Sequence, residues 1–401
     1  MKDTNVLSVN NDVKWIGVLD ENIVTFDIVM ETQHGTTYNS YFIDADKKVI
    51  IDTVKESFKE VYLNKIQQVV NPADIDYIIV NHTEPDHSGS LKYLLKRAQK
   101  AIVYGSRQAI NYLNEMIDIP FNSVAVKDGD TLDLGNKVIH FISAPNLHWP
   151  DTIYTYLKED HLLFTCDSFG AHYCSSEMFD DKIDDYSDAF KYYFDMILKP
   201  FSKFMIKAIE KIRLLPIQAI CPGHGPILRK TWKEKIELSD KYANEYIADS
   251  LCMENNILIT YVSAYGYTRQ MAEKIAVGIK KVVDYKINIV DIEKILLGEL
   301  EELIVRSNAI LVGSPTINQN TLLPIYKMFA LINPIRDKGK KAAAFGSYGW
   351  SGEAVQLIEN QLKSLKLNVV MEGFSTRFFP QKDKEQHLIE FGEGFGKQLL
   401  N

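Results

Sequence analysis

Seven side chains that can bind metal ions follow apolar, strand-like segments of this sequence. The segment IDYIIV leads into NHTEPDHSGS, which places four of them within six residues: His82, Glu84, Asp86 and His87. Three more follow later segments of the same kind: His148, Asp167 and His224. Loops at strand ends let a rigid sheet present ligands from distant sequence positions. We therefore expect one site built from four imidazoles and three carboxylates.

This ligand set suffices for two metal ions if one carboxylate bridges them and each ion keeps an open position. Asp167 is the candidate for the bridge. Two ferrous ions would bring four positive charges against three carboxylates, and oxidation would add two more, which favours a bridging hydroxide or oxide. Hard oxygen donors mixed with imidazole favour iron or manganese, whereas zinc relies more on nitrogen and sulfur. The pattern therefore favours redox chemistry.

The other histidines lack this context. A solitary histidine is more often a satisfied surface or core residue than a ligand, so no role is assigned to His34, His140, His161, His172 or His387. The cluster from His82 to His87 differs, because a solvated charged loop has no need of two imidazoles interleaved with two acids.

Three polar loops in the second half of the chain form another candidate site. The first follows ILITYV and opens a helix, with hydroxyls around Gly266, which is a phosphate-binding arrangement. The other two follow later strand-like segments, where open α/β sheets bind ligands. A G-x-G-x-x-G fingerprint is absent, which favours a mononucleotide over a dinucleotide. The candidate binding residues are Ser263, Tyr265, Gly266, Tyr267, Thr268, Ser314, Pro315, Thr316, Ile317, Asn318, Ser347, Tyr348, Gly349, Trp350 and Gly352.

The elements that must position these loops change character along the chain. Before residue 250 we expect short strands and occasional helices, with hairpins at residues 39–54 and in IYTYLKEDHLLFTCD, and helical spacing at residues 227–250. From Asn256 a strand, loop and helix alternate, which predicts a doubly wound parallel sheet. Its strand candidates are ILITYV, KINIVDI, AILVG, KKAAAFG and LNVVME. We expect two domains, residues 1–252 and 253–401.

Composition excludes several classes of protein. The 401 residues are 46% hydrophobic and 24% charged, as in an ordinary globular protein. A formal net charge of -8 argues against a nucleic-acid partner. The sequence has neither a secretory signal nor an apolar run long enough to cross a membrane, so we expect a cytoplasmic protein. The four cysteines form no C-x-x-C pair, which excludes an attached rubredoxin-type iron site.

The motif H-x-E-x-D-H at residues 82–87, with His148, Asp167 and the G-H-G around His224, resembles the diiron domain of flavodiiron proteins. The similarity covers essentially the whole chain. It implies a metallo-β-lactamase-like αββα sandwich followed by a flavodoxin-like domain, whose aromatic loops would hold FMN. Hydrolases of the first fold carry H-x-H-x-D-H and bind zinc. Glu84 replaces their second histidine, and this exchange moves the interpretation from hydrolysis to redox chemistry.

The resemblance also implies roles for individual residues. It makes His82, Glu84 and His148 ligands of one iron, Asp86, His87 and His224 ligands of the other, and Asp167 the bridge. Tyr193 matches a family tyrosine near the active site, with core packing as the alternative. Many family members have a histidine beside the metals where this chain has Phe26 and Asp27, which leaves the preference between dioxygen and nitric oxide open.

The implied function is reduction of dioxygen to water, nitric oxide to nitrous oxide, or both. A ferrous pair and a reduced flavin together store the four electrons that dioxygen needs. Family resemblance further implies rubredoxin or another small electron donor, and a head-to-tail homodimer or a dimer of dimers. Two alternatives remain from the sequence: a dizinc hydrolase with a flavodoxin-like module, and a non-catalytic electron carrier.

Overall fold

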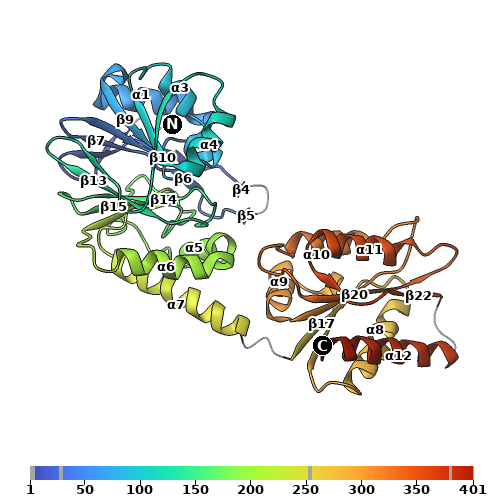
Figure 1. The fold of residues 1–401 in the computed structure, drawn as a ribbon. Helices are drawn as coiled ribbons and strands as arrows, with labels where there is room; N and C mark the ends of the chain where they lie inside the picture. Colours follow the sequence, from blue (N-terminus) through green and yellow to red (C-terminus); the bar gives the residue numbers. More distant parts are fainter. Residues whose placement is uncertain (1–4, 27–29, 252–254, 379–381, 401) are drawn as a thin grey trace. The chain divides into compact units, whose positions relative to one another are not determined.

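The computed structural model describes residues 5–26, 30–251, 255–378 and 382–400. The chain forms two compact units, residues 1–247 and 248–401, each with its own sheets and apolar cores (Figure 1). The boundary expected between residues 252 and 253 lies outside the described residues. Among the helices in these ranges, none combines the length and apolar composition that crossing a bilayer needs.

The first unit contains a seven-stranded sheet in the order β1-β2-β7-β8-β9-β10-β11. The hairpin expected at residues 39–54 is confirmed, because β7 and β8 pair antiparallel with Tyr41 opposite Ile51. From β8 onward the strands run parallel. The strands are Leu7–Ser8, Val13–Trp15, Tyr41–Asp44, Lys48–Ile51, Ile75–Ile79, Ile102–Ser106 and Asn122–Val126, in sheet order.

A second, five-stranded sheet in the same unit has the order β12-β13-β14-β15-β16. The hairpin expected in IYTYLKEDHLLFTCD is formed by β14 and β15, and β16 then joins β15 in parallel. The strands are Thr131–Asp133, Val138–Ser143, Ile153–Leu157, Leu162–Cys166 and Ala219–Pro222. Two small ribbons complete the unit, formed by β3 with β6 (Val18–Asp20 and Thr36–Tyr38) and by β4 with β5 (Thr25–Phe26 and Met30–Glu31).

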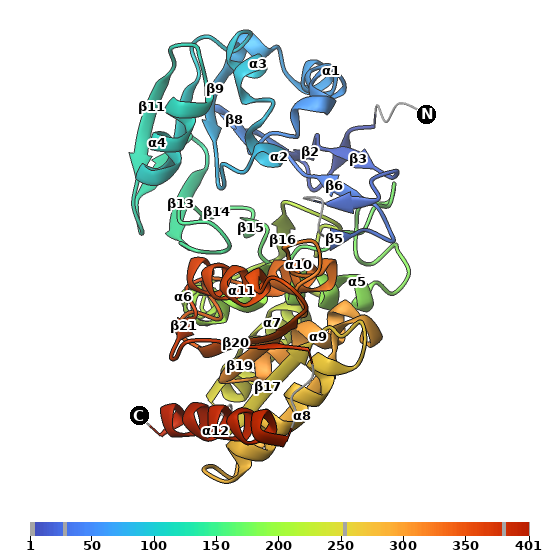
Figure 2. The same cartoon turned by 90° about the vertical axis from the view of Figure 1, so that its right-hand side faces the viewer.

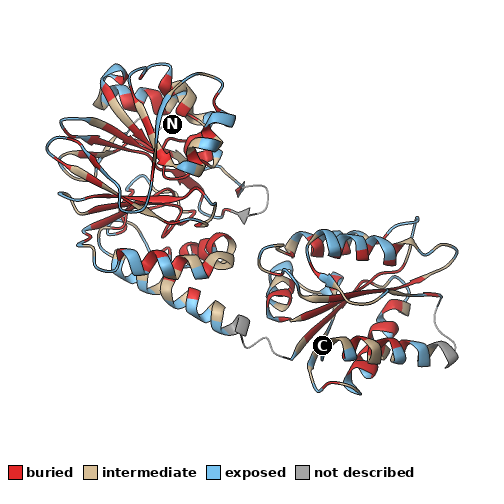
Figure 3. Cartoon of the chain, viewed as in Figure 1, coloured by how far each residue is buried: buried red, intermediate tan, exposed pale blue. Residues whose placement is uncertain are grey.

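The two sheets of this unit pack face to face, with helices on both outer sides, which gives the expected αββα sandwich (Figure 1). Apolar side chains of β7 and β8 meet those of β13 and β15 in a shared core, and buried residues predominate in β7, β8 and β15 (Figure 3). The helices on one side are α1 (Lys59–Val69), α2 (Pro85–Ser88), α3 (Leu91–Leu95) and α4 (Arg107–Met116). Those on the other are α5 (Ser187–Tyr193), α6 (Ser202–Ile212) and α7 (Trp232–Leu251).

The second unit is a parallel sheet in the order β18-β17-β19-β20-β21, as the flavodoxin-like pattern predicts. Its strands are β17 (Asn256–Tyr261), β18 (Lys286–Asp291), β19 (Ala309–Gly313), β20 (Lys341–Tyr348) and β21 (Asn368–Val369). Helices α8 (Tyr267–Lys280) and α12 (Lys382–Leu399) cover one face, and α9 (Leu297–Arg306), α10 (Leu323–Leu331) and α11 (Glu353–Ser364) cover the other (Figure 2).

The strand expected at LNVVME is longer than the strand that the structure forms there. Only Asn368 and Val369 form β21, which pairs with the first residues of the long strand β20. A further strand, β22 (Phe374–Arg377), pairs in parallel with the last residues of β20. Strand β20 is eight residues long. Two short strands, β21 and β22, therefore pair with its two ends along this edge of the sheet.

Candidate functional site: a metal centre and a flavin pocket

The metal-binding candidates come from loops that follow four strands at one edge of the first unit. The loop after β9 carries His82, Glu84, Asp86 and His87, with Pro85 starting the short helix α2. His148 follows β13, Asp167 directly follows β15, and His224 lies in the turn after β16. The structure brings all seven residues together in two groups that adjoin at Asp167.

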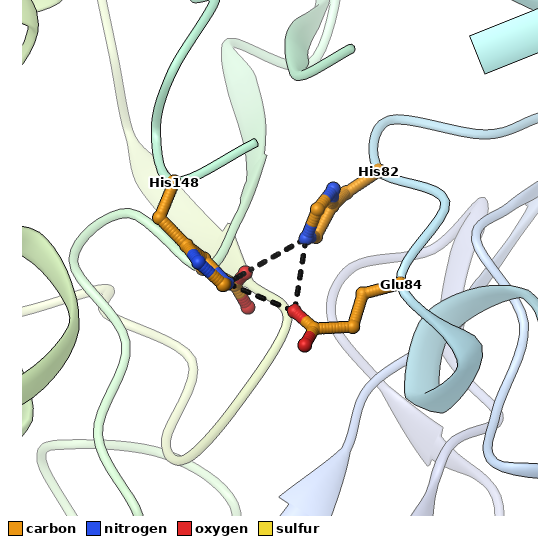
Figure 4. Close-up of side chains that lie close together, drawn as sticks. His82, Glu84 and His148 are labelled. Carbon is orange, nitrogen blue, oxygen red and sulfur yellow. Dashed lines mark hydrogen bonds and ion pairs between the residues drawn. The ribbon is translucent and has the colours of Figure 1, made fainter. Parts of the chain in front are cut away.

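Glu84 lies between two imidazoles in the first group (Figure 4). Its Oε2 is 3.2 Å from His82 Nε2 and 2.8 Å from His148 Nε2. Asp167 Oδ2 lies 3.4 Å from His82 Nε2 and 3.3 Å from His148 Nε2. Donor atoms of these four residues all lie within 4.8 Å of one another. They converge closely enough to hold one ion.

The second group consists of Asp86, His87 and His224. Asp86 Oδ2 is 3.3 Å from His87 Nε2 and 3.1 Å from His224 Nε2. The other oxygen of Asp167, Oδ1, is 3.0 Å from His87 Nε2 and 3.4 Å from His224 Nε2. Asp167 therefore turns one oxygen toward each group, which is the arrangement that a bridging carboxylate requires.

Two of the imidazoles are held from behind by groups outside the cluster. His82 Nδ1 lies 3.4 Å from Oδ2 of Asp151, a fully buried carboxylate that also accepts hydrogen bonds from the backbone N–H and hydroxyl of Thr83. His224 Nδ1 donates to the carbonyl oxygen of Thr37 at 2.6 Å. Such contacts fix a ring's orientation and leave Nε2 free for a metal.

A pocket of about 610 Å³ occupies the carboxyl ends of the strands in the second unit. Most of the predicted binding residues line it: Tyr265, Tyr267, Pro315, Thr316, Ile317, Asn318, Ser347, Tyr348, Gly349 and Trp350. Phe378, which follows β22, also lines the pocket. Its walls are therefore largely aromatic and amide groups, which suit a flat ring system.

The other five predicted residues lie outside the lining of this pocket. Gly266 precedes α8 with a φ of 82°, a left-handed conformation that glycine adopts without strain. The hydroxyl of Thr268 is 3.3 Å from that of Ser347, and Ser314 Oγ accepts a hydrogen bond from a backbone N–H. Gly352 caps α11. The hydroxyl of Ser263 is buried and has no hydrogen-bond partner among the described residues.

Comparisons with known proteins identify the family of each unit. A profile described as ODP family beta lactamase matches residues 36–225, and one described as Flavodoxin matches residues 259–392. The chain is 40% identical over 399 residues to Flavo-diiron protein FprA2 of Clostridium acetobutylicum, covering 98% of this chain and 99% of that protein. The chain belongs to the flavo-diiron protein family.

Other family members extend the comparison. A nitric oxide reductase of Moorella thermoacetica is 34% identical, with 98% of this chain and 99% of that protein covered. The structure of rubredoxin oxygen:oxidoreductase from Desulfovibrio gigas superposes with a TM-score of 0.72 at 26% identity, covering 99% of each chain. The predicted resemblance and fold class are confirmed, and the alternative of a dizinc hydrolase is not favoured.

Family membership implies two iron ions and FMN, and the residues present fit both groups. Oδ1 of Asp86 is buried and makes neither a hydrogen bond nor an ion pair with the described residues, whereas Oδ2 of Asp86 and Oδ2 of Asp167 face imidazoles without forming hydrogen bonds. Buried oxygens of this kind are costly unless a cation or donor satisfies them. At the other site, the unpartnered hydroxyl of Ser263 lies in the loop before α8, where a helix N-terminus favours a phosphate.

The metal-binding side chains strongly affect one another's pKa values. Burial opposes the charged forms of His82 and His148, but contacts with carboxylates, Glu84 among them, raise the pKa of each to about 10. The same balance raises the pKa of His87 to about 9. Burial raises the pKa of Asp167, yet His87 and the other imidazoles outweigh it and hold that pKa well below its usual range. Without a metal, the cluster is a set of buried ion pairs.

Aromatic side chains pack around His224. Its ring centroid is 5.1 Å from that of His172, 5.3 Å from Phe26 and 6.0 Å from Tyr193. The hydroxyl of Thr36 is 2.9 Å from His172 Nδ1 and 3.4 Å from His224 Nδ1. Burial lowers the pKa of His172 well below its usual range, and repulsion from His224 lowers it further, so this ring is neutral.

Tyr193 lies beside His172 and His224, close to the metal-binding residues, as the resemblance implies. Its hydroxyl is buried and makes no hydrogen bond with the described residues, and burial raises its pKa far above the usual range. Phe26 packs against His172 at a centroid distance of 4.4 Å. Asp27, the other residue at the departure from the family pattern, lies outside the described residues.

Sequence reasoning missed three residues that the structure places at the two sites. His172 follows Asp167 by five positions and Asp151 follows His148 by three. In both cases, closeness in the sequence to a residue already assigned to the site was the only signal. Phe378 had none, because it follows the short strand β22, whose sequence FSTR shows no apolar run.

Proposed function

We propose that this chain reduces dioxygen to water, nitric oxide to nitrous oxide, or both, as an FMN- and diiron-dependent oxidoreductase. One observation carries the proposal: Glu84 Oε2 lies between His82 Nε2 and His148 Nε2. An oxygen donor at this place gives a nitrogen and oxygen ligand set suited to iron. Relatives named as a nitric oxide reductase and as a rubredoxin oxygen:oxidoreductase support both substrates.

Each of the site residues would have a distinct role. His82, Glu84 and His148 would hold one iron, Asp86, His87 and His224 the other, and Asp167 both. If bound, iron would supply the gas-binding and redox-active centre, and FMN would supply electrons. Tyr193 and His172 lie beside His224, and the buried hydroxyl of Tyr193, which has no hydrogen-bond partner among the described residues, is available to hydrogen-bond to a substrate.

The test is a rapid-mixing experiment on the fully loaded protein. Reduced protein is mixed anaerobically with dioxygen or nitric oxide while flavin absorbance is followed, and iron content is measured in parallel. Both flavin and iron should be oxidised within one turnover with at least one gas. Flavin that stays reduced with both gases, or zinc in place of iron, would sink the proposal. The relative turnover rates then decide which gas is preferred.

We further propose that a rubredoxin or another small electron donor supplies the electrons, and that the chain acts in the cytoplasm as a head-to-tail homodimer or a dimer of dimers. The rubredoxin-linked relative supports the donor. Cys166 and Cys221 are free, buried thiols, which suits a reducing compartment. The flavin pocket is rimmed by Tyr265, which is 81% exposed, and Trp350, which is 76% exposed. Such exposed aromatic groups are typical of docking surfaces.

Mixing two inactive variants tests the head-to-tail arrangement. Glu84→Gln disables the metal centre, and Gly349→Glu puts bulk and negative charge into the flavin pocket. After subunit exchange, half of the dimers contain one copy of each variant and keep one working pair of sites. Activity should then recover to about a quarter of wild type, because each mixed dimer retains one of its two pairs. No recovery, despite exchange shown by mass spectrometry, would rule the arrangement out.

A further inference from the structure

A second pocket in the first unit lies away from the metal cluster. It has a volume of about 530 Å³, within the range of small-molecule sites. It opens on the face of β13 and β14 next to the loop that follows α6. His161, which lines it, precedes β15, whereas Asp167 follows the same strand. A strand of this length separates the two ends by about 16 Å, so the pocket is distinct from the metal centre.

Side chains of the sheet form the floor of this pocket, and they are largely apolar. Ile142 of β13 and Tyr156 of β14 form its base, and Leu215 and Pro216 form the wall after α6. His140 stands on the same face of β13 as Ile142, two residues earlier, and opposite Tyr156 in the sheet. A planar or branched apolar group can therefore lie on this floor without burying any backbone polar group, since the strands satisfy theirs within the sheet.

Two side chains that line the pocket can donate hydrogen bonds and have no hydrogen-bond partner among the described residues. Lys158 and His140 line the pocket, and neither side chain makes a hydrogen bond or ion pair with the described residues. In contrast, Lys211 is paired with Asp128 at 3.0 Å and also donates to the carbonyl oxygen of Ser143. Lys158 is therefore the uncompensated cation of the pocket, in a chain whose formal net charge is -8.

We propose that this pocket binds a small organic anion with a flat apolar body. The body would lie on Ile142, Tyr156 and Pro216, and its carboxylate or sulfonate would accept hydrogen bonds from Lys158 and His140. Charge-assisted hydrogen bonds of this kind are stronger than neutral ones and fix the orientation of a ligand. Neither the metal cluster nor the flavin pocket contributes a residue to this site.

The test uses 8-anilinonaphthalene-1-sulfonate, a fluorescent aromatic sulfonate, on protein loaded with iron and FMN so that the flavin pocket is filled. We expect saturable binding of one molecule per chain. Lys158→Ala and His140→Ala should each weaken it by about tenfold, since each removes a hydrogen bond to a charged group. Lys100→Ala is the matched control, because Lys100 is an exposed lysine of the same unit that pairs with Asp76.

A neutral analogue, N-phenyl-1-naphthylamine, separates charge recognition from apolar adhesion. Its affinity should be the same for wild type and Lys158→Ala, because it has no acid group. Equal sulfonate binding by wild type and both pocket variants would overturn the proposal. Equal losses for both probes in Lys158→Ala would also overturn it, because charge would then not be recognised. Lys158 is exposed, so its replacement should leave the fold intact.

Discussion

Asp151 shows how a single buried residue can control a metal ligand that it does not replace. Its carboxylate faces His82 Nδ1 and receives two hydrogen bonds from Thr83. It therefore holds the imidazole in the orientation that presents Nε2 to Glu84 and Asp167. Among the described residues, His224 has no such carboxylate behind it, and its Nδ1 donates to a backbone carbonyl instead. The ring of His82, in the first group, thus has a carboxylate behind it, which is a stronger electron donor than the carbonyl oxygen behind His224.

We predict that Asp151→Asn weakens iron binding by about 10- to 100-fold, the usual effect of losing a partner behind a metal-bound histidine. The amide keeps the shape of the side chain but removes its charge. Competition with a chelator, read by iron content and by the Mössbauer spectrum, measures the effect and shows whether one iron is lost first. Asp133→Asn, an exposed carboxylate of the same unit, is the control. Unchanged affinity and spectra in Asp151→Asn would refute this role.

The raised pKa values of the imidazoles predict a pH dependence of the metal-free protein. Burial opposes their charge, but carboxylates raise the pKa of His82 and His148 to about 10 and of His87 to about 9. A raised pKa stabilises the fold fully below the unfolded value of about 6.5, and this contribution disappears as pH rises through the folded value. Asp167 has a lowered pKa, so its contribution is present above about pH 4 and disappears on acidification.

Metal-free protein should therefore lose stability between about pH 6.5 and pH 10. Iron-loaded protein should lose less over the same interval, because its histidines are already bound in the neutral form. The midpoint of thermal unfolding of the first unit, followed by calorimetry across this interval, measures the difference. Iron loading at pH 7 should also release protons into a weakly buffered solution. Parallel stability curves with no proton release would contradict the interpretation.

At the scale of elements, strands with continuous apolar runs were predictable and the short ones were not. The hairpins of β7 with β8 and of β14 with β15 follow from two apolar runs around a polar turn. The same reasoning placed β17 and β19, because buried parallel strands read as unbroken apolar segments. It overestimated β21 and missed β22, because their pairing is set by the length of β20 rather than by their own sequences.

The site was predictable for a related reason. Four ligands share one loop, and the other three directly follow strands or turns that the sequence marks clearly. His172 and Asp151 were not predictable, because a solitary polar residue gains its role from what packs around it. His172 lies beside Thr36 and His224, which are distant from it in the sequence. Such contacts arise only when strands from different parts of the chain meet at one edge.

Two glycines give a matched test of helix packing in the second unit. Gly278 of α8 lies against α12 so closely that an added Cβ would be 2.0 Å from the carbonyl oxygen of Ile389. Gly298 of α9 has no atom within 4 Å of such a Cβ. Gly278→Ala should reduce the free energy of unfolding by about 1–3 kcal/mol, because the helices must move apart. Gly298→Ala should raise it by about 0.5 kcal/mol through helix propensity.

Urea unfolding of the FMN-loaded chain, followed by flavin fluorescence, measures both effects. The opposite signs separate close packing from the intrinsic preference for alanine in helices. If Gly278→Ala were as stable as Gly298→Ala, the close contact between α8 and α12 would be wrong.

At the scale of the whole molecule, each unit carries one cofactor site on its own core. Every proposed iron ligand belongs to residues 82–224, and every residue lining the flavin pocket belongs to residues 265–378. The apolar cores likewise divide between the units, with two clusters in each. A ligand that binds only the native form of one unit should therefore stabilise that unit and leave the other unchanged.

Calorimetry of the metal-free, flavin-free chain should then show two unfolding transitions. FMN at 100 times its dissociation constant should stabilise one of them by about 2.7 kcal/mol, and iron should raise only the other. Gly278→Ala identifies the transition of the second unit, since its packing defect lies there. A single transition that both cofactors raise together would show that the units unfold as one, and the cofactors would then support each other's sites through the fold as well as through electron transfer.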